Sequence, residues 1–142
     1  AIFGFGYAAS VTAVTNLVTN AGVIGTDVTG VGTARNALTA CSYGYDKGIF
    51  GFGAAGGPAL AMTNLVSNAG VMSSDVAAVV GVHARYAPGA TQYGGDKGIF
   101  GFGANGGRVG MTNLVSNAGV VATDVTAVGT ARDGISACSW GS

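Results

Sequence analysis

The chain has 142 residues, a formal net charge of zero and only 8% charged residues, so it offers no basic surface for nucleic acid or anionic lipid. Its mean hydropathy of +0.48 argues against a freely solvated disordered chain despite 27 glycines, and little net charge opposes self-association. No apolar run approaches the roughly 20 residues that a membrane-spanning helix needs.

The sequence contains three copies of one unit, residues 1–47, 48–97 and 98–142. Each copy carries Ile-Phe-Gly-Phe-Gly, then Thr-Asn-Leu-Val with Asn-Ala-Gly-Val one residue later, then an aspartate and an Ala-Arg pair. The period is close to 50 residues, which is typical of propellers and solenoids. We therefore expect the copies to form three similar structural units.

Four short strands are expected in each unit, and the middle of the chain shows them in order. Residues 37–43 and 49–52 are apolar segments on either side of a Gly-Tyr-Asp-Lys turn. Residues 62–66 precede the polar, glycine-containing cluster 67–70, and residues 71–80 are rich in β-branched side chains. Helix is the competing interpretation of the alanine-rich parts, but the density of Val, Thr and Gly without a capping box disfavours it.

In this order the unit resembles a kelch repeat. Kelch units carry an Arg before an apolar strand, a short polar turn, a hydrophobic strand ending in a glycine pair, and two further strands. Here residues 50–53 stand where the glycine pair would be and residues 63–66 where the third strand would be, although the usual Tyr and Trp have no counterpart. The resemblance implies an all-β propeller of four-stranded blades, three per chain, with a binding or scaffolding role. A β-solenoid of the same strands is the alternative fold.

The two ends of the sequence predict how the blades are completed. The sequence starts at an Ile-Phe-Gly segment and stops after residues 137–140, where the next such segment would follow. We therefore expect the last strand to pair with residues 1–6 of the same or another chain, which would remove exposed sheet edges. Propellers typically have 4–8 blades, so two chains head to tail would give six, and a rotation that does not close would give a filament. A longer chain that contains these residues is a further alternative.

Charged residues recur once per copy at two positions. They are Asp27, Asp75, Asp124, Arg35, Arg85 and Arg132. A catalytic site needs a unique constellation, whereas a charge repeated in every copy is more often structural. We expect each Asp–Arg pair to form a salt bridge within its blade or to cap turn amides. A ring of arginines that binds an anion is the functional alternative.

The phenylalanines of the glycine-rich segments are expected to fill the space between blades. They include Phe50, Phe52, Phe100 and Phe102. The Gly-x-x-Gly-x-Gly run around them also has glycines spaced like those of a nucleotide-binding loop. However, no helix pattern follows it and it recurs along the chain, so close packing of strands explains it better.

No enzymatic chemistry is expected. The only histidine, His83, has no cysteine or carboxylate at ligand spacing and no nucleophile beside it, so we predict no catalytic residue, no metal and no cofactor. Cys41 and Cys138 occupy the same position in the first and third copies, where Thr91 stands in the second. This favours a small, partly buried residue, and it leaves a disulfide open if the two Cα atoms lie within about 4.4–6.8 Å.

One aromatic residue ends the last expected strand of each copy. These three are the candidate binding residues, Tyr43, Tyr93 and Trp140. Exposed rings there could stack on sugars, whereas packing at blade edges is the structural interpretation. The sequence as a whole predicts a non-enzymatic structural or assembly protein, extracellular or on a virion surface, whose partner is another copy of itself. A carbohydrate-binding, lectin-like propeller with glycan partners is the alternative.

Overall fold

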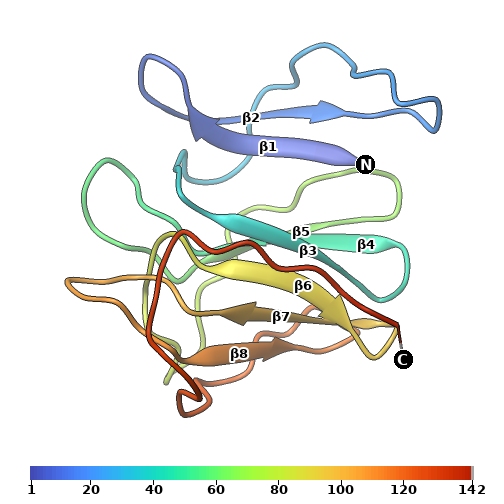
Figure 1. The fold of residues 1–142 in the computed structure, drawn as a ribbon. Helices are drawn as coiled ribbons and strands as arrows, with labels where there is room; N and C mark the ends of the chain where they lie inside the picture. The colour runs from blue at the N-terminus through green and yellow to red at the C-terminus, as the bar shows by residue number, and fades with distance from the viewer. Residues whose placement is uncertain (142) are drawn as a thin grey trace.

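The computed structural model describes residues 1–141, which form eight strands and no helix. The all-β fold expected from the sequence is confirmed. The strands form three small antiparallel sheets, which lie one below another in Figure 1. The first sheet contains β1 (Ile2–Tyr7) and β2 (Val11–Leu17). The second contains β3 (Thr39–Tyr43), β4 (Lys47–Gly51) and β5 (Thr63–Val66), and the third contains β6 (Gly89–Tyr93), β7 (Lys97–Gly101) and β8 (Thr112–Val115).

The second and third sheets are built alike. In each, a central Lys-Gly-Ile-Phe-Gly strand has a partner on both sides, and the register is the same, with Cys41 opposite Ile49 and Thr91 opposite Ile99. The turn between β3 and β4 is tight because Gly44 adopts a φ of 56°, a conformation that glycine reaches without steric cost. The second and third sheets thus each take their first strand, β3 or β6, from the end of the preceding sequence copy.

Residues 71–80 do not form a regular strand, so that expectation was wrong. Their backbone meets β5 at two isolated bridges, Val66 with Met72 and Thr63 with Val76, and the Ser73 amide donates to the carbonyl of Leu65 at 2.8 Å. A side chain replaces part of the ladder, because the Leu65 amide donates to Ser73 Oγ at 2.8 Å. The described sheets have three regular strands at most rather than the four of a blade, and the three sheets of residues 1–141 do not close into a ring.

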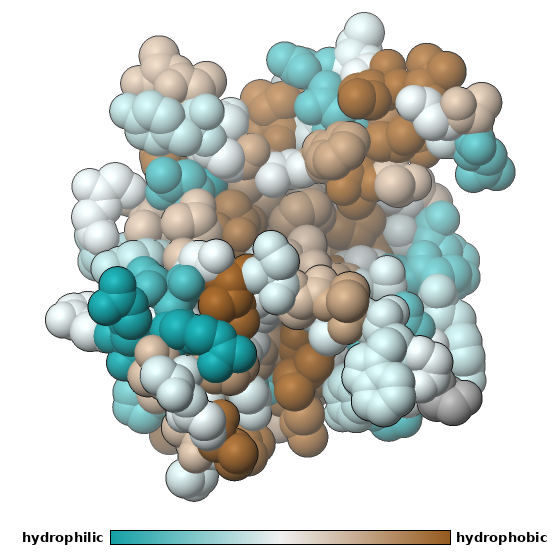
Figure 2. All heavy atoms as spheres, in the orientation of Figure 1, coloured by the Kyte–Doolittle hydropathy of each residue, from teal (hydrophilic) through white to brown (hydrophobic). Residues whose placement is uncertain are grey.

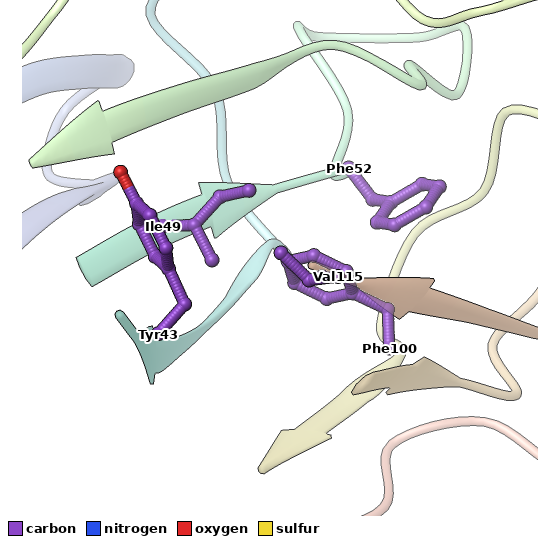
Figure 3. Close-up of a cluster of buried hydrophobic side chains, with 5 residues drawn as sticks. All are labelled: Tyr43, Ile49, Phe52, Phe100 and Val115. Carbon is purple, nitrogen blue, oxygen red and sulfur yellow. The ribbon is translucent and has the colours of Figure 1, made fainter. Parts of the chain in front are cut away.

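Aromatic side chains pack successive sheets together. Figure 3 shows the main buried cluster, which draws on the second and third sheets and consists of Tyr43, Ile49, Phe52, Phe100 and Val115. Phe52 packs edge-on against Phe100 with ring centroids 5.1 Å apart, and Phe5 packs against Phe50 at 5.5 Å. Phe102, by contrast, is only half-buried. The same kind of aromatic contact therefore joins the first sheet to the second and the second to the third.

Candidate functional site

A buried arginine joins the first sheet to the second. The Arg35 side chain is fully buried, and its guanidinium lies 4.2 Å above the centre of the Phe5 ring. Its Nε donates to the carbonyl of Phe52 at 2.9 Å, and its Nη2 donates to Asn64 Oδ1 at 2.6 Å. Because Phe5 belongs to the first sheet and Asn64 to the second, this one side chain holds both. We call the set Phe5, Arg35, Asn64 and Asp75 the first junction.

The carboxylate of the first junction is held by several donors. Asp75 accepts from the amide of Thr33 at 2.9 Å, from its hydroxyl at 2.7 Å, and from Asn64 Nδ2 at 2.9 Å. Arg35 Nη1 lies 3.8 Å from the same carboxylate. Burial alone would raise the pKa of Asp75, but these hydrogen bonds and the arginine charge hold it below its ordinary value. The aspartate therefore stays ionised opposite the guanidinium at neutral pH.

The second junction repeats this arrangement between the second and third sheets, with Phe52, Arg85, Asn113 and Asp124. Arg85 lies 3.9 Å above the Phe52 ring, donates to Asn113 Oδ1 at 2.6 Å, and approaches Asp124 at 3.9 Å. Burial lowers the pKa of Arg85 to about 10, which leaves the guanidinium protonated at neutral pH. The second junction differs in two ways. His83 takes the place of Thr33, with its amide and its ring both contacting Asp124, and Arg85 Nε is buried without a hydrogen-bond partner in the described chain, whereas Arg35 Nε donates to Phe52.

The Asp–Arg pairs of the two junctions run between sequence copies and not within one copy. Arg35 pairs with the aspartate of the second copy, and Arg85 with that of the third. Asp27 is left in the first copy, where it accepts from Asn16 Nδ2 at 2.8 Å, as Asp75 does from Asn64. Among residues 1–141 no arginine reaches this Asn–Asp pair.

The opposite end of the molecule carries the complementary half. Arg132 lies 4.1 Å above the Phe102 ring, as its two counterparts lie above theirs. Its side chain is exposed, and within the described chain it donates only to the carbonyl of Thr130, at 3.0 Å. Half of a junction therefore lies on the first sheet and the other half on the third.

The stacked phenylalanine has an unusual backbone in each copy. Phe5, Phe52 and Phe102 adopt φ values of 64°, 65° and 63°, a left-handed conformation that is uncommon for a bulky residue. Such a backbone costs about 1–3 kcal/mol and persists only where surrounding contacts determine it. Here each ring lies beneath an arginine guanidinium, which supplies one such contact in every copy.

The candidate sugar-binding residues lie in unequal surroundings. Tyr43 belongs to the buried core and is only 3% exposed, whereas Tyr93 is 36% exposed and Trp140 is 90% exposed. Tyr93 and Trp140 line one hollow beside the C-terminal segment, which Tyr43 does not share. The structure therefore does not present the three rings as equivalent exposed clusters.

The remaining candidates form no assembled chemical site. Cys41 and Cys138 are both free thiols, and burial raises the pKa of Cys41 to about 11, so this thiol is unreactive at neutral pH. Within residues 1–141, no cluster of three or more His, Cys, Asp or Glu side chains is placed to hold a metal ion. The same residues include no helix that is long and apolar enough to cross a membrane.

The asparagines Asn64 and Asn113 are junction residues that the sequence reasoning missed. Their recurrence in Thr-Asn-Leu-Val was the available signal. Comparison of the sequence with protein-family models finds no matching family, and comparison with curated proteins finds no significant match. The junction itself is therefore the basis for a functional proposal.

Proposed function

We propose that this protein is a non-enzymatic structural subunit that assembles head to tail by forming its internal junction between chains. The observation that carries the proposal is the pair of unmatched halves, the Asn16–Asp27 pair on the first sheet and Arg132 over Phe102 on the third. Two complete junctions within the chain give the geometry in which these halves would meet. Arg132 of one copy would donate to Asn16 of the next and face Asp27.

Exposure of apolar side chains on and beside the first sheet supports this assembly. Phe3 is 61% exposed, whereas its counterparts Phe50 and Phe100 are 7% and 0% exposed because a neighbouring sheet covers them. Figure 2 shows apolar surface over the part of the molecule where the first sheet lies, and exposed Val23 and Ile24 belong to that sheet's following loop. A neighbouring copy would cover Phe3 as the first sheet covers Phe50.

The assembly has two possible outcomes, which the rotation between neighbouring copies decides. Two chains that close on each other would contribute six sheets, a number within the range of propellers and in keeping with the kelch resemblance. A rotation that does not close would continue the stack as a filament. Either product is a structural one, suited to an appendage or a virion surface. The lectin-like alternative stays a prediction, since Tyr43, Tyr93 and Trp140 form no repeated exposed cluster in residues 1–141.

The experiment is native mass measurement with negative-stain imaging of the purified chain, up to high micromolar concentration. We expect wild type to form assemblies in whole multiples of 13.7 kDa, as a closed pair or a filament. Arg132→Met should remain a single chain under the same conditions because it lacks the donor half. The matched control is Arg108→Met, which removes an exposed arginine outside the junctions and should assemble like wild type. A single-chain mass for wild type at all concentrations would refute the proposal.

A further inference from the structure

The C-terminal segment already lies where the first strand of a fourth sheet would lie. The amide of Gly134 donates to the carbonyl of Ala87 at 3.0 Å, just as the amide of Ala87 donates to the carbonyl of Ala37 at 2.6 Å. The segment then runs alongside β6 (Figure 1), as β6 lies against β3. Its sequence, Cys-Ser-Trp at residues 138–140, matches Cys-Ser-Tyr in β3. Residues 136–140 have the position of a strand but no strand partner in the described chain.

The first sheet has a strand, β1, with one edge that no described strand pairs with. β4 and β7 are central strands with a neighbour on both sides, whereas β1, their counterpart, pairs only with β2 among the described residues. A cavity of about 470 Å³ opens beside the start of β1, where Ala1 and Ile2 line it, and reaches β3 and β4. Ile2, Cys41, Gly48 and Gly70 are among the residues that line it. In the second sheet, the corresponding place beside β4 is filled by β3.

The packing of β3 on the third sheet shows which kind of strand could fill this cavity. β3 lies against β6 and β7, and Gly98 of β7 is so close that a Cβ built on it would lie 2.7 Å from Cys41 Sγ. Gly48 is the counterpart of Gly98 and lines the cavity. The absence of a side chain at Gly48 therefore leaves room for a cysteine thiol, and the matching cysteine of the C-terminal segment is Cys138.

The aromatic residue at the end of the segment also has a matching place. Tyr43, at the end of β3, packs so closely on the loop of the third copy that a Cβ on Gly119 would lie 2.9 Å from its ring. Gly70 is the counterpart of Gly119 and lines the cavity. Trp140 is the counterpart of Tyr43 and is 90% exposed in the single chain. A second copy would therefore bring Trp140 against Gly70 and remove its ring from water.

We propose that this cavity binds residues 136–140 of a second copy as an added strand, antiparallel to β1. This rests on the head-to-tail assembly proposed above and defines its backbone contact. The register follows from the second sheet, where Cys41 lies opposite Ile49 and Thr39 opposite Gly51. Cys138 of the donor thus lies opposite Ile2, and Ser136 opposite Gly4. Main-chain hydrogen bonds supply the attachment, and small side chains beside Gly48 and Trp140 beside Gly70 fix the register.

A disulfide between chains tests the register. Directly opposed residues of antiparallel strands present their side chains on the same face with Cα atoms about 4.5–5.5 Å apart, within the range of a disulfide. In Ile2→Cys/Cys41→Thr, mild oxidation should join the new cysteine to Cys138 of another chain, giving covalent species of two or more chains on a non-reducing gel. Thr is a conservative choice at residue 41 because Thr91 holds that position in the second copy.

The matched control is Phe3→Cys/Cys41→Thr, whose new thiol lies on the other face of β1. It should cross-link far less, at least tenfold by band intensity. Equal cross-linking of both variants, or none with Ile2→Cys, would overturn the inference. So would a disulfide within one chain, which mass spectrometry of the monomer band would reveal. If wild type assembles while Ile2→Cys stays uncross-linked, the strand inference fails and the proposed function stands; if wild type never assembles, both fail.

Discussion

Arg85→Met should lower the free energy of unfolding by about 3–5 kcal/mol, because it breaks a buried charge pair from one side. Methionine keeps an unbranched apolar side chain but removes the charge over Phe52, the donor to Asn113 and the cation facing Asp124. The carboxylate would then stay largely buried with no arginine near it. Urea unfolding followed by circular dichroism measures the loss as a lower midpoint at unchanged slope.

Arg132→Met is the matched control for that experiment. Arg132 stacks on Phe102 as Arg85 does on Phe52, but it is exposed and meets no carboxylate in the described chain. At a concentration where the protein is a single chain, its removal should change stability by no more than about 0.5 kcal/mol. Equal losses in the two variants would show that the charge, and not its burial in a junction, determines the effect.

Phe100→Ala should lower the free energy of unfolding by about 3–5 kcal/mol, the usual range for a buried phenylalanine. Phe100 is fully buried and packs edge-on against Phe52. The backbone of Gly51 lies directly against its ring, since a Cβ there would be 2.8 Å from the ring atoms. Two strands therefore frame the space that the ring would vacate, which limits how far the cavity can collapse. Thermal and urea unfolding both measure this loss.

Phe3→Ala tests the same residue type at the equivalent place without a neighbouring sheet. Because Phe3 is 61% exposed, its truncation should cost the single chain only about 0.5 kcal/mol. The difference between the two variants measures what one sheet gains from covering the next. A loss with Phe3→Ala as large as with Phe100→Ala would mean that the first sheet is stabilised by contacts other than those described.

The sequence predicts the all-β fold and most strand positions well, because the signals for strands are local. Apolar, glycine-bounded segments such as residues 49–52 become strands, and the copies repeat the same register. Residues 71–80 fail because β-branched composition does not distinguish a regular strand from a segment held by side chains such as Ser73 and Asn64. The number of sheets and their open arrangement depend on contacts between copies, which no local pattern contains.

Recurrence identifies the charged residues of the junctions but not their partners. Asp75 and Arg85 are neighbours in one copy, yet Asp75 pairs with Arg35 of the preceding copy. Tyr43 shows the same effect. It is buried by a loop of the third copy, at Gly119, which is far from it in sequence. Sequence spacing orders residues along a unit, whereas a stacked repeat protein is held together by nearest-neighbour interfaces.

The most direct test of head-to-tail assembly is to mix two variants with opposite defects and measure native mass. Arg132→Met lacks the donor half and keeps Asp27, whereas Asp27→Arg lacks the acceptor half and keeps Arg132. Each variant alone should remain a single chain. Their equimolar mixture should give a pair of one chain of each kind and nothing larger, because only one complementary contact remains. If wild type assembles while the mixture stays as single chains, or if either variant alone assembles like wild type, the junction is not what joins the chains.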